Sequence, residues 1–228
     1  MRELLTHRPA SAQTVFATTG DEAWQFEVDR LADAAGVEIV RVTEQVLAAM
    51  ADTVQPQGVV AVGRIEQSSL GHVFSGARLV AVMHEVRDPG NAGAVLRAAD
   101  AAGADAVVFS GESIDPWHPK VVRATTGSLF HLPVATAATL DDVVFAAREA
   151  GVSVLAADVS GEDLRTNDGV LNTRLAWVFG NEARGLSATQ LALADRAVRL
   201  PIYGQAESLN LATAASVLLY LTAFAQRG

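Results

Sequence analysis

The sequence predicts an α/β fold in which a small αβ domain precedes a larger domain built on a mostly parallel sheet. From residue 78 onward, short apolar runs alternate with helical stretches, which is the order of βαβ units. Half of the 228 residues are hydrophobic (50%), which is enough for packed cores and excludes wholesale disorder. Before residue 70 the same alternation recurs on a smaller scale.

In the larger domain, expected over residues 76–228, the candidate strands are short apolar runs. They span residues 78–84, 105–110, 129–135, 153–159, 175–180 and 197–202. Helices are expected over residues 91–103, 141–151 and 208–226, and the first two end in glycine. The last is apolar nearly all round, so we expect it to be buried or to form a subunit interface.

The smaller domain, expected over residues 1–70, has strands and helices in the order βαβαβ, at residues 14–18, 27–36, 38–42, 44–52 and 58–63. Only a short stretch precedes the first strand. The sequence leaves open whether residue 1 is the native start or whether an opening element is missing. Residues 69–76, rich in serine and glycine, are expected to be the linker between the domains.

The composition excludes several classes of protein. No apolar run approaches the roughly 18 to 20 residues of a membrane span, and no signal peptide is visible, so we expect a soluble, cytoplasmic protein with no membrane partner. The absence of cysteine excludes disulfides, thiolate metal sites and a cysteine nucleophile. The five histidines show no ligand spacing, so no metal is expected. A formal net charge of -9 means that any polyanion must be held by a few well-placed arginines.

Three loops that follow predicted strands carry polar residues. The first contains Asn91 and leads into a helix with Arg97; helix capping by Asn91 and a snorkelling surface position for Arg97 are the simplest explanations. The last contains Ser208 and Asn210, for which helix capping is again the simplest explanation. Such loops gather at the carboxyl edge of an open parallel sheet, where ligands bind. We therefore expect these side chains to share a site.

The middle loop, residues 180–187, carries Glu182 and copies the glycine spacing of a nucleotide-binding P-loop. Leu186 stands where that motif requires lysine, and Glu182 would repel phosphate, so binding of a nucleoside triphosphate is disfavoured. No strand is followed by G-x-G-x-x-G, which disfavours a dinucleotide site.

Three segments, in this order and spacing, resemble the signature motifs of the SpoU (TrmH) family of the SPOUT superfamily, the RNA ribose 2′-O-methyltransferases: NAGAVLRAADAAGADAVVFSG, WVFGNEARGLS and LPIYGQAESLNLATAASVLLY. The connecting stretch DPWHPKVVRATTGSLFHLPV is also similar to this family, so the resemblance spans residues 78–226. Residues before 70 resemble, more weakly, the small substrate-binding domain of the family.

The resemblance implies a trefoil-knotted α/β domain, a homodimer and S-adenosylmethionine as the cofactor. It places the cofactor against Gly180, Leu200, Ile202 and Leu209. A physical argument agrees, because glycine allows close backbone approach and aliphatic side chains form an apolar slot for a purine.

The resemblance also assigns the chemistry of the active site to Asn91, Arg97, Glu182, Ser208 and Asn210. In this family, the arginine at the position of Arg97 is proposed to remove the proton of the ribose hydroxyl, and an RNA phosphate is proposed to assist it. A guanidinium is a poor base at neutral pH, so holding the phosphate and stabilising the developing alkoxide is the easier role. Glu182 would anchor Arg97 or an arginine of a second subunit, while Ser208 and Asn210 orient the loop and the ribose.

Basic residues near these loops would bind RNA, and a homodimer would double their number: Arg87, Arg97, Lys120, Arg123 and Arg184. For Arg87 and Lys120, an ordinary surface position without RNA contact is the alternative. Ribosomal RNA is the expected substrate, because the N-terminal domain resembles that of ribosomal RNA enzymes. The alternatives are a transfer RNA 2′-O-methyltransferase, an enzyme that methylates a base nitrogen, and a non-catalytic RNA-binding or ribosome-assembly protein that keeps the knot.

Overall fold

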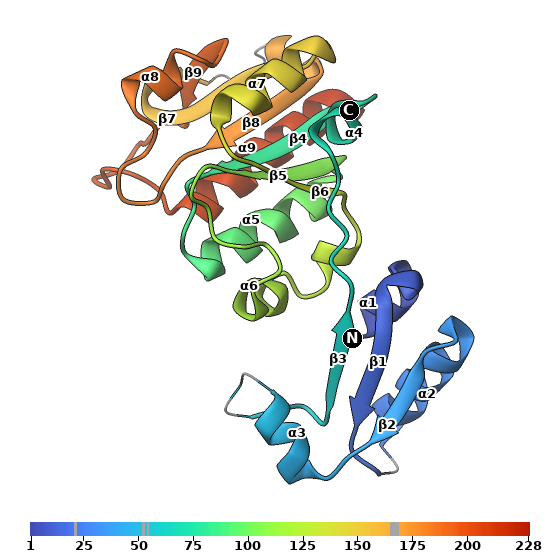
Figure 1. Cartoon of the computed structure of the whole chain (residues 1–228). Helices are drawn as coiled ribbons and strands as arrows, with labels where there is room; N and C mark the ends of the chain where they lie inside the picture. The colour runs from blue at the N-terminus through green and yellow to red at the C-terminus, as the bar shows by residue number, and fades with distance from the viewer. Residues whose placement is uncertain (21, 52, 54, 165–168) are drawn as a thin grey trace. The chain divides into compact units, whose positions relative to one another are not determined.

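The chain forms two compact units, Met1–Glu66 and Gln67–Gly228, each with its own core (Figure 1). The structure is a computed structural model, and it describes residues 1–20, 22–51, 53, 55–164 and 169–228.

The first unit is a three-stranded sheet with helices, in which β1 pairs parallel with β2 and antiparallel with β3. Its elements are α1 (Arg2–His7), η1 (Pro9–Ser11), β1 (Ala12–Ala17), α2 (Ala23–Ala35), β2 (Glu38–Arg41), α3 (Glu44–Met50) and β3 (Val59–Gly63). The expected order of strands and helices is present. The short stretch before β1 forms a helix, α1, that buries Leu5 in the core and that the sequence did not predict. The helix expected over residues 44–52 ends at Met50, and Asp52 lies outside the described residues.

The second unit alternates strands and helices throughout. Its elements are α4 (Leu70–Phe74), β4 (Leu79–His84), α5 (Pro89–Ala102), β5 (Ala106–Ser110), α6 (Pro119–Ala124), η2 (Ser128–Phe130), β6 (Val134–Ala137), α7 (Leu140–Glu149), β7 (Ser153–Asp163), η3 (Gly169–Asn172), β8 (Leu175–Phe179), α8 (Ala188–Leu191), β9 (Arg196–Arg199) and α9 (Leu211–Arg227). The strand order is β6-β5-β4-β8-β7-β9, and every pair is parallel, as the sequence predicts.

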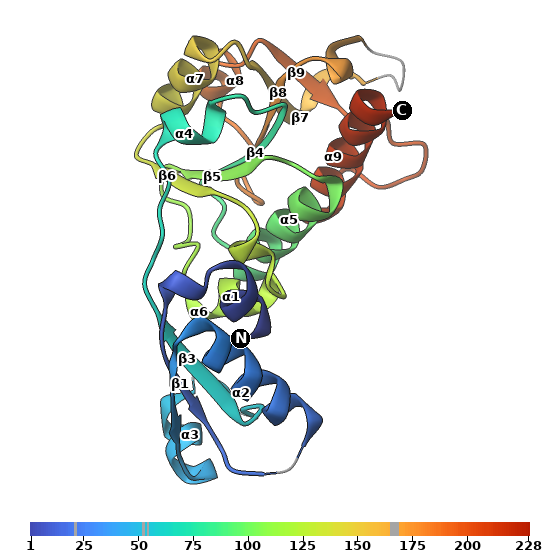
Figure 2. The ribbon, with the colours of Figure 1, turned by 90° about the vertical axis from the view of Figure 1, so that its right-hand side faces the viewer.

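Both faces of this sheet are buried. Successive residues of a strand face opposite sides, so Val80 and Val82 of β4 join one core cluster while Ala81 and Met83 join the other. Figure 2 shows α5 and α9 against one face and α4 and α7 against the opposite face. This arrangement explains why the strands appear in the sequence as continuous apolar runs.

Several predicted boundaries differ from the structure, and three of these differences change an element or the linker. The strand expected over residues 129–135 is divided into η2 and β6, because Gly127 turns the chain with φ 112 and starts a 3₁₀ turn. The strand expected over residues 197–202 ends at Arg199, just before Pro201, which cannot donate a hydrogen bond to a sheet. The expected linker over residues 69–76 contains α4, and its Val73 and Phe74 are buried in the core of the second unit.

The C-terminal helix α9 is buried along one side only. That side packs along α5 and against the sheet, where the Trp177 Nε1–H donates to Thr222 Oγ1 at 2.9 Å. On the other side Val217, Tyr220 and Phe224 are 41%, 39% and 67% exposed. No helix among the described residues is long and apolar enough to cross a membrane.

Candidate active site

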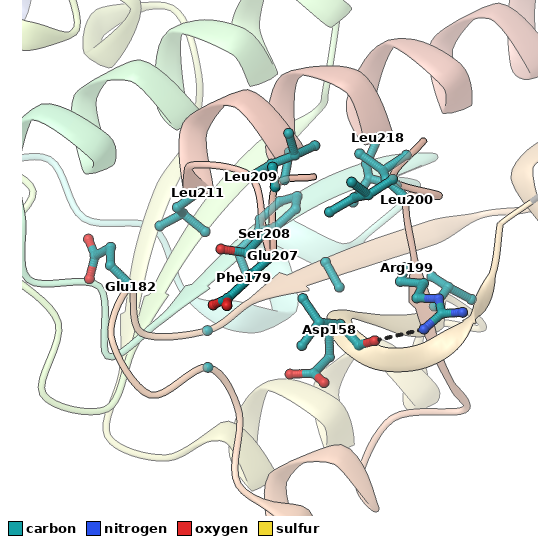
Figure 3. Close-up of a pocket in the computed structure, with 18 of the residues that line it drawn as sticks. Asp158, Phe179, Glu182, Arg199, Leu200, Glu207, Ser208, Leu209, Leu211 and Leu218 are labelled. Atoms are coloured by element: carbon teal, nitrogen blue, oxygen red, sulfur yellow. Dashed lines mark hydrogen bonds between the residues drawn. The ribbon is translucent and has the colours of Figure 1, made fainter. Parts of the chain in front are cut away.

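A cavity of about 710 Å³ opens at the carboxyl edge of the large sheet (Figure 3). It is enclosed by the ends of β7, β8 and β9, by the loop after β8 and by the loop that leads into α9. Chain connections change direction at the neighbouring strands β4 and β8, and such points in open parallel sheets form crevices for ligands. The cavity includes the end of β8 and therefore lies beside this crevice.

One wall of the cavity is apolar and comes from several elements. Its side chains are Phe179, Val198, Leu200, Ile202, Leu209, Leu211 and Leu218. Ile202 and Leu209 are 38% and 41% exposed, so they stand at an accessible part of the cavity. All four residues expected to hold the cofactor line this one cavity: Gly180, Leu200, Ile202 and Leu209. An accessible apolar slot of this size fits a nucleoside.

Gly180 permits a close approach, but the approaching group is the loop's own backbone. A Cβ at Gly180 would lie 2.7 Å from the carbonyl carbon of Gly185 and 2.8 Å from Leu186 Cγ. The loop closes on itself there through a bridge between Asn181 and Gly185. Leu186, which stands at the lysine position of a P-loop, is buried in the core. Gly180 is thus required for the shape of the loop that lines the cavity.

Asn181 fixes this loop to the end of β4, a role that the sequence did not reveal. Its Nδ2 donates to the Glu85 carbonyl at 2.8 Å. Its Oδ1 accepts from the backbone N–H groups of Ala183 and Arg184 at 3.0 and 3.2 Å. The sequence offered one signal for this role: Asn181 directly follows Gly180 at the end of a predicted strand, and asparagine is a typical turn residue.

A chain of hydrogen bonds joins the three polar loops. The Glu182 carboxylate accepts from the backbone N–H groups of Arg87 and Asp88, at 3.4 and 3.2 Å, and from Asn91 Nδ2 at 3.4 Å. The Asn91 Oδ1 in turn accepts from Asn210 Nδ2 at 3.0 Å. Residues far apart in the sequence thus meet beside the cavity, whose lining includes Glu182 and Ser208.

The capping explanation is wrong for Asn91. The cap of α5 is Asp88, whose Oδ1 accepts from the Asn91 N–H at 2.7 Å. Pro89 occupies the first helical position, which proline favours, and the helix therefore starts before Asn91. The side chain of Asn91 is free to bridge Glu182 and Asn210.

The two candidates before α9 differ. Asn210 is the cap, because its Oδ1 accepts from the N–H groups of Ala212 and Thr213 at 2.9 and 3.2 Å. Ser208 is not the cap, since the helix begins at Leu211, and its side chain lines the cavity instead.

Arg97 is exposed on α5 and is not part of the cavity lining of its own chain. Its guanidinium has no hydrogen bond or ion pair within the described ranges. The expected anchoring of Arg97 by Glu182 is therefore absent within one chain, where the Glu182 carboxylate binds the loop before α5.

The other basic residues near the loops have different surroundings. Arg184 forms an ion pair with Glu85 at 3.0 Å, and Arg87 pairs with Glu112. Lys120 is exposed at the start of α6.

His84 is a buried titratable residue at the end of β4 that the sequence did not single out. Its Nδ1 lies 2.9 Å from Ser110 Oγ, and its Nε2 lies 2.8 Å from the Gln190 side-chain nitrogen. Burial lowers the pKa of His84 from its ordinary value of 6.5, and the Glu85 carboxylate at 3.9 Å opposes that shift in part. A neutral imidazole with a proton on Nδ1 satisfies both contacts.

Comparison with known proteins gives two family matches along the chain. Residues 2–68 match the RNA 2′-O ribose methyltransferase substrate binding family, and residues 78–220 match the SpoU rRNA Methylase family. The chain is 34% identical over 189 residues to the 23S rRNA (guanosine(2553)-2′-O)-methyltransferase of Bacillus subtilis (strain 168), covering 81% of this chain and 72% of that protein.

Two solved structures are similar over nearly the whole chain. One is the AdoMet-bound rRNA methyltransferase from Sinorhizobium meliloti, with a TM-score of 0.80 and 31% identity over 93% of this chain and 79% of that one. The other is the SpoU methyltransferase AviRb from Streptomyces viridochromogenes in complex with AdoMet, with a TM-score of 0.82 and 29% identity over 98% and 87% of the two chains. The matched residues include all three loops of the candidate site, and the chain belongs to the SpoU rRNA Methylase family.

Proposed function

We propose that this protein transfers a methyl group from S-adenosylmethionine to a ribose 2′-hydroxyl of ribosomal RNA. The observation that carries the proposal is one nucleoside-sized cavity whose polar rim joins all three motif loops through Glu182, Asn91 and Asn210. S-adenosylmethionine, when bound, supplies an activated methyl group on a sulfonium. The residues that would hold it are Gly180, Leu200, Ile202 and Leu209.

The polar residues would position the ribose and its hydroxyl. Glu182 keeps the loops after β4 and β8 together, and Asn91 and Asn210 present amide groups beside the cavity. Ser208, which lines the cavity, would contact the ribose. Arg97, a permanent cation without a partner among the described residues, would hold an RNA phosphate and stabilise the alkoxide as the proton leaves.

The first unit supports RNA as the substrate, because it matches a substrate-binding family of RNA 2′-O-methyltransferases. Ribosomal RNA is favoured over transfer RNA, since the relatives described above are named as rRNA enzymes. Such a substrate implies a cytoplasmic protein.

A homodimer and the trefoil knot of the family are part of this proposal. The exposed stripe of Val217, Tyr220 and Phe224 on α9 supports the dimer. The knot is supported by the path of α9, which follows the edge strand β9 but packs along α5 beside the central strand β4.

The test is transfer of labelled methyl from S-adenosylmethionine to separate pools of ribosomal and transfer RNA, followed by digestion to nucleosides. Label in a 2′-O-methylnucleoside from ribosomal RNA is expected with the wild type and with Arg148→Ala on α7, and is expected to be lost in Arg97→Ala. Label confined to transfer RNA would favour a transfer RNA enzyme, and label on a base would favour base methylation. Cofactor binding without any transfer would indicate a non-catalytic RNA-binding protein.

A further inference from the structure

We propose that Asp158 makes the cavity prefer positively charged S-adenosylmethionine over its neutral product S-adenosylhomocysteine. The inference rests on the proposed function and concerns a specificity residue outside the three motif loops. Loss of the methyl group turns a sulfonium into a neutral thioether, so the two ligands differ by one positive charge. A carboxylate in the cavity wall that forms no ion pair with a described residue distinguishes the two ligands through that charge.

The backbone places Asp158 in the cavity by means of a bulge in β7. In the pairing of β7 with β9, Val198 is the partner of both Ala157 and Glu162, so residues 158–161 are extruded from the ladder. Bulges next to active sites redirect side chains in this way. The bulge returns tightly against β9, because a Cβ at Gly161 would lie only 2.5 Å from the backbone nitrogen of Val198.

The two oxygens of Asp158 have different surroundings. Oδ1 accepts from the Ser160 N–H at 2.9 Å and from the Ser160 hydroxyl at 2.6 Å, which fixes the carboxylate. Oδ2 accepts no hydrogen bond within the described part of the chain, and it lies 3.2 Å from the position of a Cβ on Gly185. Oδ2 therefore lies next to the loop that forms the adjoining wall of the cavity (Figure 3). A fixed carboxylate with one free oxygen is ready to act on a ligand.

The positive groups in the lining do not neutralise Asp158. Arg199 is paired with Asp163, with Nε and Oδ1 2.7 Å apart, and Arg184 is paired with Glu85. The remaining carboxylates of the lining are those of Asp158, Glu182 and Glu207, and only Asp158 is half-buried. Its charge is consequently the least screened by solvent.

The test is calorimetric measurement of both dissociation constants, in the absence of RNA, on the full chain. Asp158→Asn is expected to lower the preference for S-adenosylmethionine over S-adenosylhomocysteine by about three- to tenfold, almost entirely through weaker binding of S-adenosylmethionine. The matched control is Glu162→Gln, which removes one charge from the same strand outside the cavity and is expected to leave the preference within about twofold. Asp158→Glu, which keeps the charge, is expected to retain the preference for S-adenosylmethionine.

Equal weakening of both ligands in Asp158→Asn would overturn the proposal in favour of a hydrogen bond to a ribose hydroxyl, which both ligands carry. An unchanged preference would also overturn it. If Asp158→Asn does not fold, both dissociation constants of the wild type can be measured at increasing salt concentration instead. The preference for S-adenosylmethionine over S-adenosylhomocysteine is expected to decrease, because salt screens the charge of Asp158. A constant preference would contradict a charge effect. A wild type that binds neither ligand would overturn the proposed function itself.

Discussion

Arg97 offers a way to separate catalysis from cofactor binding. It lies outside the cavity lining and carries a charge without a partner among the described residues, so its removal leaves the cavity unchanged. We expect Arg97→Ala to lower kcat by about 100-fold or more, as is typical when a group that stabilises transition-state charge is deleted. The dissociation constant for S-adenosylmethionine should stay within about twofold of the wild type. Calorimetry and single-turnover methylation measure the two effects, and loss of cofactor affinity would contradict the assigned role.

His84 makes the stability of the second unit depend on pH. Burial lowers its pKa in the folded state below the ordinary value of 6.5, so the unfolded state takes up the proton first as the pH falls. The free energy of unfolding should therefore decrease below about pH 6.5 and be fully retained above it. His84→Gln keeps an amide beside Ser110 and Gln190 but does not titrate, and we expect it to flatten the dependence of Tm on pH between about 5 and 7.5. An equally steep dependence in this variant would contradict the assignment.

At the scale of elements, Arg174 connects two helix ends to the start of β4. Its guanidinium donates to the carbonyls of Ala77, Ala150 and Phe74 at 2.8, 2.7 and 3.2 Å. The last two are the carbonyls at the ends of α7 and α4, where a cation is favoured.

We expect Arg174→Ala to lower the free energy of unfolding of the second unit by about 2 to 3 kcal/mol, because hydrogen bonds from a charged group are lost together. Arg97→Ala, which removes an exposed arginine of the same unit, should change the free energy of unfolding by less than about 0.5 kcal/mol. Urea unfolding measures both. A Trp24→Phe background confines the tryptophan fluorescence to the second unit, and a small effect of Arg174→Ala would show that water replaces the guanidinium.

The elements that the sequence predicted well are those whose signal is local. The central strands are continuous apolar runs because both faces of the sheet are buried, and α5 and α7 were found from their periodicity and terminal signals. Signals from single residues were misjudged. Pro89 is the first residue of α5, so Asp88 and not Asn91 is its cap, and β9 ends before Pro201.

The candidate site was predictable only in part, for a similar reason. Residues within motif loops could be named from the sequence, whereas contacts between loops required the fold. Asn181 and His84 act on partners distant in the sequence, and Asp158 reaches the cavity through a bulge that no periodicity indicates.

For the whole molecule, the proposed dimer gives a role to the exposed position of Arg97: we expect a second subunit to complete the site. Arg97 is exposed on α5, on the same face as Ala101, whose carbonyl accepts from the Tyr220 hydroxyl at 3.4 Å. Tyr220 belongs to the exposed stripe of α9, so a dimer formed through that stripe brings Arg97 to the interface. In a two-fold dimer, each Arg97 would then act at the cavity of its partner.

This arrangement predicts that two inactive variants restore activity when combined. The Arg97→Ala chain has an intact cavity, and the Glu182→Ala chain has an intact Arg97. If Arg97 acts across the interface, a mixed dimer therefore contains one complete site, formed by the cavity of the first chain and the arginine of the second. Random pairing should then recover about a quarter of wild-type activity, because half of the dimers are mixed and each has one complete site of two. If Arg97 acts within its own chain, both sites of the mixed dimer are defective and no activity returns. Adding Phe224→Glu to both chains places a charge in the proposed interface and should abolish the recovery, with light scattering showing a monomer.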